Sequence, residues 1–171
     1  CAVTMAGGQG SRLGHKGPKG TYDIGLPSHK SLFEIQCDGL KRISEKAKVA
    51  IPWYIMTSET NHEESVAFFE KNNYFGYPKK DIMFFKQSMI PVMDKQGRIL
   101  LESPSKILKS PNGNGGLFSS LKDKSIFSDM RKRGIKWIFI CGIDNVLVRM
   151  ADPYFLGFTI KNKYKASAKS F

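Results

Sequence analysis

Short apolar runs alternate with longer segments of helical periodicity along most of the chain. Strands are predicted by the apolar runs at residues 1–5, 53–57, 82–85 and 137–141. Helices are predicted by apolar residues at helical spacing over 32–48, 60–71 and 115–133, and from Asp152-Pro153 onward. Because strands and helices alternate, we expect a three-layer α/β domain with a mostly parallel mixed sheet.

Polar residues at the ends of these segments indicate helix starts and a turn. Ser31-Leu-Phe-Glu34 and Thr60-Asn-His-Glu63 both have the pattern of a capping box at the start of a helix. Asp94-Lys-Gln-Gly97 separates two apolar runs and predicts the turn of a β-hairpin between 90–93 and 98–101.

A glycine-rich loop follows the first predicted strand. It runs from Gly7 to Gly14, and glycines there let backbone N–H groups approach an anion closely. It is not a Walker A loop, because Lys19 precedes Gly20. It is not a dinucleotide fingerprint either, because Leu13 occupies the third glycine position. The glycines alone therefore indicate an anion-binding turn or an ordinary one.

Two cations accompany this loop, since Arg12 lies inside it and Lys19 lies just beyond it. An arginine binds phosphate oxygens through parallel N–H groups, whereas a lysine supplies a point charge. A loop that carries both suits a triphosphate, on which negative charge builds up as pyrophosphate leaves.

Three further motifs fall at predicted strand ends or loops, where ligands bind in α/β sheets. Asp144 follows a predicted buried strand, and a carboxylate there suits Mg²⁺ beside phosphate, the alternative being a turn aspartate. The loop 110–116 leads into a helix and suits a flat polar ligand, or is a plain turn. Gln87 offers a donor and an acceptor, which match the imide edge of uracil, but alone it is an ordinary strand-end residue.

The composition restricts the class of protein but does not indicate a particular function. The chain has 171 residues, 41% of them apolar, which is ordinary for one globular domain. It begins without Met, so we expect a piece of a longer protein. We expect no membrane span, because the chain has no run of 18 apolar residues. The net charge of +12 suits polyanionic partners, but the lysines are spread among apolar segments and indicate a solvated surface.

Cysteines and histidines show no pattern of their own. Cys1, Cys37 and Cys141 match neither a zinc site nor a disulfide framework, which favours a reducing, cytoplasmic setting. The histidines at 15, 29 and 62 lack the spacing of a metal site or a catalytic triad. Covalent nucleophilic catalysis is therefore not expected.

Taken in order, these motifs resemble those of the UDP-N-acetylhexosamine pyrophosphorylases and related UDP-sugar pyrophosphorylases. The resemblance covers nearly the whole chain, and two departures from the family pattern are Ser11 for the commoner Thr and Asn112 for Asp. The shared stretches are 6–14, 18–28, 52–58, 74–76, 84–87, 111–116, 144–148 and 151–153.

The resemblance implies a Rossmann-like nucleotidyltransferase core of the glycosyltransferase-A type, incomplete here because family members run to several hundred residues. Residues 1–171 would form the nucleotide-binding part of a uridylyltransferase catalytic domain. Family members join UTP and a sugar 1-phosphate, with Mg²⁺, into a UDP-sugar and pyrophosphate. The expected sugar is N-acetylglucosamine 1-phosphate.

The resemblance also implies roles at the glycine-rich loop. Lys19 would bind the UTP phosphates, and Arg12 would favour the pyrophosphate, so these two are the expected catalytic residues. The residues expected to contact the nucleotide through the backbone are Met5, Ala6, Gly7 and Gly8.

Further along the chain, the resemblance implies four more nucleotide-binding residues. Gln87 and Gly113 would read the uridine, and Asn114 would reach the nucleotide-sugar. Asp144 would hold the metal ion near the phosphates.

Other functions remain open on the sequence alone. The enzyme could act on glucose 1-phosphate or on several sugars, because the segment expected to bind the sugar lies beyond residue 171. A catalytically inactive relative is a further alternative. A non-catalytic polyanion-binding module would need aromatic platforms beside lysine stripes, whereas residues 68–69 and 84–85 are phenylalanines at predicted core positions. Neither nucleic acid nor a membrane is expected as a partner, and the sequence predicts no oligomeric state.

Overall fold

Four parallel strands form the central sheet of the computed structural model, which describes residues 1–170. They are β1 (Ala2–Met5), β2 (Trp53–Thr57), β3 (Ile82–Lys86) and β8 (Phe139–Gly142), in the order β3-β2-β1-β8. All three pairings are parallel, so the predicted α/β class is confirmed, and the antiparallel strands lie in two separate small sheets.

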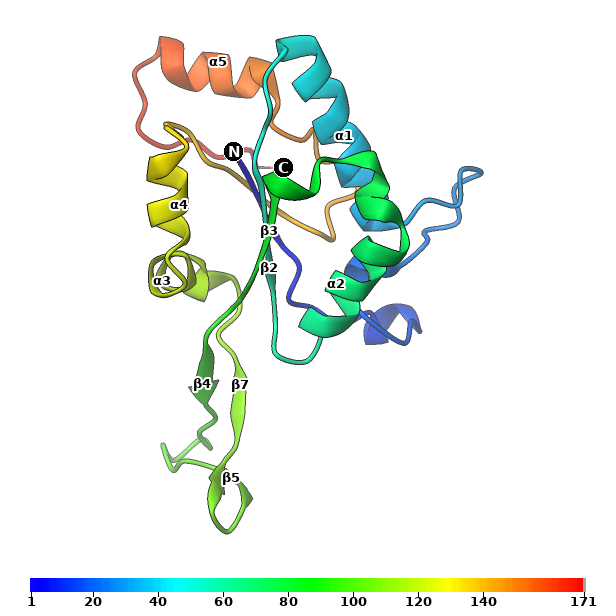
Figure 1. The fold of residues 1–171 in the computed structure, drawn as a ribbon. Helices are drawn as coiled ribbons and strands as arrows, with labels where there is room; N and C mark the ends of the chain where they lie inside the picture. The colour runs from blue at the N-terminus through cyan, green and yellow to red at the C-terminus, as the bar shows by residue number, and fades with distance from the viewer. Residues whose placement is uncertain (171) are drawn as a thin grey trace.

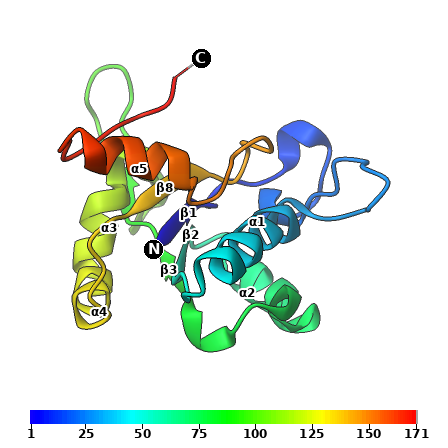
Figure 2. The ribbon, with the colours of Figure 1, turned by 90° about the horizontal axis from the view of Figure 1, so that it is seen from above.

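Helices cover both faces of this sheet (Figures 1 and 2). On one face lie α1 (Leu32–Ala47) and α2 (His62–Lys71), and on the other lie α3 (Leu117–Asp123) and α4 (Ile126–Lys132). The strands alternate between the two resulting cores: Trp53 and Ile55 belong to one, Tyr54 and Met56 to the other. This alternation follows from the two-residue period of a strand and produces the predicted three layers.

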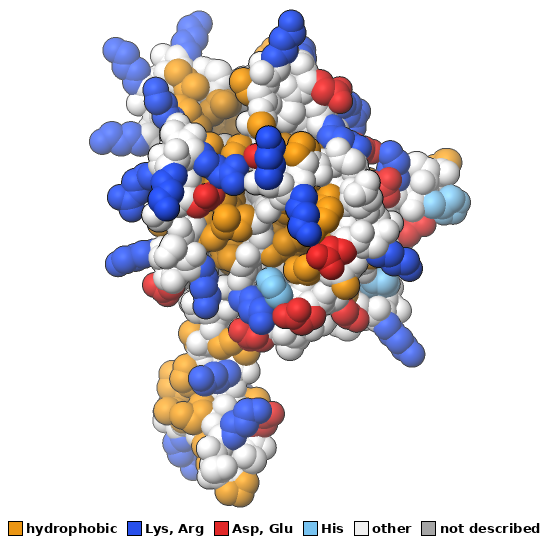
Figure 3. All heavy atoms as spheres, in the orientation of Figure 1, with side chains coloured by type: hydrophobic (Ala, Val, Ile, Leu, Met, Phe, Trp, Pro, Cys, Tyr) orange, Lys and Arg blue, Asp and Glu red, His pale blue; other side chains and the backbone are white. Residues whose placement is uncertain are grey.

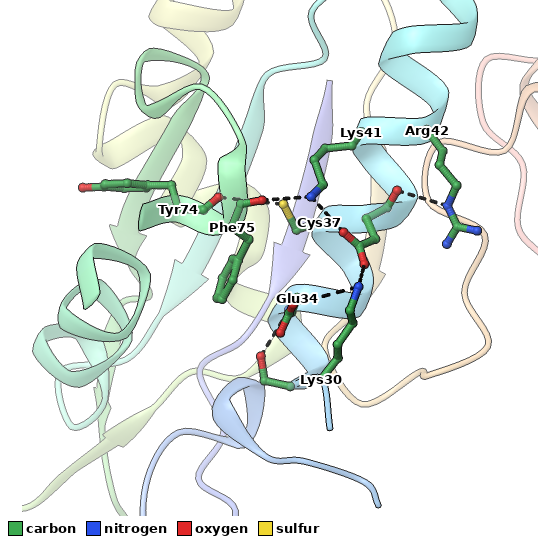
Figure 4. A network of polar contacts seen from close by, with 9 residues as sticks. Lys30, Glu34, Cys37, Lys41, Arg42, Tyr74 and Phe75 are labelled. Carbon is green, nitrogen blue, oxygen red and sulfur yellow. Dashed lines mark hydrogen bonds and ion pairs between the residues drawn. The ribbon is translucent and has the colours of Figure 1, made fainter. Parts of the chain in front are cut away.

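The helix α1 begins where its capping box predicts. The amide of Glu34 donates to the hydroxyl of Ser31 at 3.2 Å, and Lys48 ends the helix in the left-handed conformation. On the polar side, the ammonium of Lys41 contacts Asp38 and also donates to the carbonyl of Phe75 at 2.9 Å (Figure 4). This network ties α1 to the turn that follows α2.

A β-finger, residues 88–111, projects from the body (Figure 1). The predicted turn at 94–97 is confirmed, because the amide of Asp94 donates to the carbonyl of Arg98. The predicted hairpin partner is wrong for the base of the finger, where β4 (Met89–Pro91) pairs with β7 (Lys109–Pro111). The outer part carries β5 (Leu101–Ser103) and β6 (Lys106–Ile107), and hydrophobic side chains gather on its surface (Figure 3).

The predicted single helix over 115–133 is wrong, since α3 and α4 are separate. Ser125 adopts φ 59° and ψ 18°, which breaks the helix between them. The strand β8 begins at Phe139, two residues later than predicted, whereas the last helix, α5 (Pro153–Lys161), begins where predicted, with Asp152 as its N-cap. Within residues 1–170, no helix is both long and apolar enough to cross a membrane.

We expect Ser125→Gly to stabilise the protein. Left-handed backbone costs a residue with a Cβ about 1 kcal/mol or more, and glycine adopts it freely. The Ser125 side chain makes no capping bond to α4 that would be lost. The free energy of unfolding in urea should therefore rise by about 0.5 kcal/mol, after the entropy cost of glycine in the unfolded chain.

The matched control is Ser128→Gly, the same exchange at an exposed position inside α4. It should lower the free energy of unfolding by about 0.5 kcal/mol, because glycine disfavours a helix interior. A loss of stability in both variants would contradict the assignment of strain to Ser125.

Candidate active site

The glycine-rich loop lies at the carboxyl end of β1 and folds back on itself. The amide of Gly10 donates to Gly17 at 2.9 Å, and the amide of Lys19 donates to the carbonyl of Gly8 at 3.1 Å. Within residues 1–170, the N–H groups of Gly7, Gly8 and Gln9 donate to no protein acceptor. Three consecutive free N–H groups beside a lysine form a cradle suited to an anion.

Lys19 and Asp144, which are far apart in sequence, meet at the mouth of this loop. The Lys19 ammonium lies 3.7 Å from the Asp144 carboxylate, and their side chains are 24% and 68% exposed. The neighbouring strands β1 and β8 bring them together, since the amide of Ile143 donates to the carbonyl of Met5 at 3.0 Å. Such an exposed ion pair contributes little to stability, so its position matters more for a ligand than for the fold.

The structure corrects the reason for choosing Asp144. We expected a carboxylate buried at the end of a central strand, but the side chain is exposed and β8 is an edge strand of the described sheet. Gly142 leaves room for it, because a Cβ there would lie 2.5 Å from the Asp144 Oδ1. The carboxylate is therefore accessible to a ligand.

Gln87 joins two loops of the site. Its backbone amide continues the sheet by donating to Thr57 at 2.8 Å, and its side chain is buried. The side-chain Oε1 accepts from the amide of Gly113 at 3.0 Å. The Nε2 packs so close to Gly7 that a Cβ on that residue would lie only 2.1 Å from it. The acceptor that we expected to face uracil is thus engaged with Gly113, and the Nε2 donor remains.

The other predicted residues are spread around this centre. Ala6 is buried and its amide donates to Met56 at 2.7 Å, while Met5 is half-buried. Asn114 opens a short 3-10 turn before α3 and is exposed. Arg12 is exposed in the 3-10 turn Ser11–Leu13 and forms no ion pair within residues 1–170. An open hollow of about 690 Å³ lies against the outer side of the loop, lined in part by Ser11 and Lys16.

Sequence reasoning missed two residues that hold these loops. The predicted capping box at Thr60 is wrong: Asn61 is the N-cap residue of α2, and its side chain donates to the carbonyls of Ala6 and Gly8. Gln36, buried on α1, donates to the carbonyl of Gly142 at 3.1 Å and accepts from Thr4. The only signal in the sequence was a side-chain amide in or next to a predicted helix. The backbone carbonyls that these amides bind are remote in sequence, so the contacts could not be predicted.

Two titratable groups near the strand ends, His62 and Cys141, have shifted pKa values. Burial, together with the charge of Lys86, lowers the pKa of His62, whose Nδ1 lies 2.7 Å from the Thr57 hydroxyl. Burial raises the pKa of the Cys141 thiol to about 11, so this cysteine stays protonated at neutral pH. A protonated thiol is a poor nucleophile, because the thiolate is the reactive form.

The donor set at Asp144 fits Mg²⁺ only in combination with a ligand. Within the described residues, no group of three or more His, Cys, Asp or Glu side chains could hold a metal ion. Mg²⁺ keeps several waters and is commonly held by one or two carboxylates together with substrate phosphates. One exposed carboxylate beside an anion cradle matches that mode of binding.

Taken together, the parallel sheet and the site at its carboxyl edge define a nucleotidyltransferase fold with an anion-binding loop. Residues 1–169 match the family model described as UTP–glucose-1-phosphate uridylyltransferase. The chain therefore belongs to this family of nucleotidyltransferases.

Individual relatives carry more specific names than the family model does. The UDP-N-acetylglucosamine pyrophosphorylase of Saccharomyces cerevisiae is 46% identical over 172 residues, which cover 98% of this chain and 36% of the yeast protein. The crystal structure of the Trypanosoma brucei UDP-N-acetylglucosamine pyrophosphorylase superposes with a TM-score of 0.88 at 36% identity, over 95% of this chain and 35% of that one. A UDP-glucose pyrophosphorylase from Leishmania major shares only the fold, with a TM-score of 0.77 at 16% identity over 95% of this chain and 33% of that one. The chain thus spans about a third of the length of these proteins.

We expect Gly7→Ala to disconnect the two loops that Gln87 joins. The added Cβ would displace the Gln87 amide and break its bond to Gly113. Loss of this part-buried hydrogen bond and local overpacking should lower the free energy of unfolding by about 1–3 kcal/mol. Hydrogen exchange at the Gly113 amide should accelerate in the same variant.

Gly8→Ala is the matched control, because a Cβ there would meet only the end of the Lys19 side chain at 3.9 Å. Its stability and its Gly113 exchange rate should stay near wild type. Equal effects of the two substitutions would show that Gln87 does not depend on Gly7.

Proposed function

We propose that this chain supplies the UTP-binding part of an enzyme that makes UDP-N-acetylglucosamine and pyrophosphate from UTP and N-acetylglucosamine 1-phosphate. The observation that carries the proposal is the meeting of Lys19 and Asp144 at the free N–H groups of the glycine-rich loop. A cation and a carboxylate beside an anion cradle match the needs of a nucleoside triphosphate with Mg²⁺.

The reaction is an in-line displacement at the α-phosphorus of UTP. An oxygen of the sugar phosphate forms the new P–O bond, the bond between the α-phosphorus and the bridging oxygen breaks, and pyrophosphate leaves with the electron pair. No proton transfer is needed, so positioning and charge stabilisation dominate. The N–H groups of Gly7 and Gly8 would hold phosphate oxygens, while Lys19 and Arg12 would offset the charge that develops on pyrophosphate.

Asp144 would hold Mg²⁺, which neutralises phosphate charge and orients the phosphates when bound. Gln87 would donate from its Nε2 to a carbonyl oxygen of uracil, and Gly113 would also read the uridine. Met5 and Ala6 would contact the nucleotide through the backbone. Asn114, exposed before α3, would reach the nucleotide-sugar. These assignments rest on the positions of the residues around one edge of the sheet.

The sugar is assigned from the relatives. A protein named UDP-N-acetylglucosamine pyrophosphorylase is 46% identical to this chain, whereas the UDP-glucose pyrophosphorylase structure is 16% identical and supports only the shared fold. N-acetylglucosamine 1-phosphate is therefore favoured over glucose 1-phosphate. Phe69 and Phe85, two of the four phenylalanines expected at core positions, are buried in the two cores and offer no stacking platform for a polyanion.

A coupled pyrophosphate assay on the complete protein tests this function. UTP with Mg²⁺ should support turnover with N-acetylglucosamine 1-phosphate at least about tenfold faster than with glucose 1-phosphate, a preference worth about 1.4 kcal/mol. A preference for glucose 1-phosphate would overturn the sugar assignment. The absence of turnover with every sugar 1-phosphate would overturn the proposed enzymatic activity.

Lys19→Ala should lower turnover by two or more orders of magnitude, because one preorganised charge contributes roughly 3 kcal/mol in the transition state. Lys16→Ala is the matched control, since Lys16 is an exposed lysine of the same loop with no ion pair within residues 1–170. The control should keep wild-type kinetics within about twofold. Turnover near wild type in Lys19→Ala would remove Lys19 from the mechanism.

A further inference from the structure

The side chain of Asn61 is buried against the glycine-rich loop, with 1% of the residue exposed. Its Nδ2 donates to the carbonyl of Ala6 at 2.9 Å and to that of Gly8 at 3.2 Å. Its Oδ1 accepts from the amide of Ser58 at 2.8 Å. Both polar atoms of the amide are therefore satisfied inside the protein.

These two carbonyls control two of the free N–H groups of the loop. In a trans peptide the C=O and the N–H of one unit point in opposite directions. The carbonyl of Ala6 shares its peptide with the amide of Gly7, and the carbonyl of Gly8 shares its peptide with the amide of Gln9. By holding both carbonyls, of which that of Gly8 also accepts from the Lys19 amide, Asn61 turns the N–H groups of Gly7 and Gln9 away from its own side chain.

The Asn61 side chain does not serve the helix that it precedes. It is the N-cap residue of α2, yet it makes no side-chain capping bond to that helix. A second contact ties the same two segments, since the side chain of Gln9 donates to the carbonyl of Thr60 at 3.3 Å. The side chain of Asn61 thus binds the glycine-rich loop and does not cap the N–H groups at the start of α2.

We propose that Asn61 is a positioning residue for the phosphates of UTP, acting through the peptide planes of the glycine-rich loop. The inference rests on the proposed function and adds a residue to it. Asn61 itself touches no ligand, and its effect is to keep the N–H groups of Gly7 and Gln9 preorganised toward the anion. Preorganised donors avoid the cost of reorienting when the ligand binds.

Asn61→Asp tests this inference with little change in shape. The carboxylate keeps an acceptor for Ser58 but replaces the donor with an oxygen that repels the carbonyls of Ala6 and Gly8. The two peptide planes should then lose their orientation. Binding of UTP with Mg²⁺ to the complete protein, measured by calorimetry, should weaken by about tenfold or more.

The affinity for uridine, measured by ligand-observed NMR, should change by less than about twofold, because the nucleoside lacks the phosphates to which the loop N–H groups would donate. A general loss of structure would weaken uridine and UTP together, so the ratio of the two separates positioning from folding. Asn72→Asp is the control: it makes the same exchange at the other end of α2, where the Asn72 side chain donates only to the carbonyl of Phe68 among the described residues. It should leave both affinities near wild type.

Unchanged UTP binding in a folded Asn61→Asp variant would overturn the inference while leaving the proposed function intact. Equal weakening of UTP and uridine would also overturn it. If wild-type protein bound no UTP, the proposed function itself would fail. Should Asn61→Asp not fold, Asn61→Ser replaces it, because serine is a good N-cap residue but too short to reach both carbonyls. The same selective loss of UTP affinity is expected there, and its absence counts against the inference.

Discussion

The parallel pairing of β1 with β2 and β8 is the constraint on which the site depends. Because the three strands run in one direction, their carboxyl ends meet at one edge of the sheet. The register places Met5 beside Met56 and Gly142, so the segments that follow these residues emerge side by side. A shift in the pairing of β1 with β8 would separate Lys19 from Asp144.

A second constraint is the space around the first glycine of the loop. Gly7 lets the buried amide of Gln87 pass close to the backbone and reach Gly113. On the opposite side, Asn61 holds the carbonyls of the same loop. The loop is thus fixed by side chains from two other segments, and its own N–H groups stay free for a ligand. Rigid placement of such groups is what an electrostatic site requires.

Much of the fold follows from local patterns in the sequence. The apolar run at Trp53–Thr57 and the capping box at Ser31 depend on neighbouring residues, so periodicity and side-chain chemistry predict them. The break at Ser125 carries no glycine or proline and is set by how α3 and α4 pack on the sheet. The role of Asn61 was hidden for a similar reason, because its carbonyl partners lie 55 and 53 residues away. Asp144 follows β8 as predicted, but its exposed side chain, beside an edge strand, could not be predicted from the sequence.

A structure of the complete protein with bound UTP and Mg²⁺ would test most directly whether the glycine-rich loop binds the phosphates. We expect phosphate oxygens within hydrogen-bonding distance of the N–H groups of Gly7, Gly8 and Gln9, with Lys19 beside them and the metal ion on Asp144. Phosphates bound instead in the hollow beside Ser11 and Lys16, with those three N–H groups left free, would contradict it.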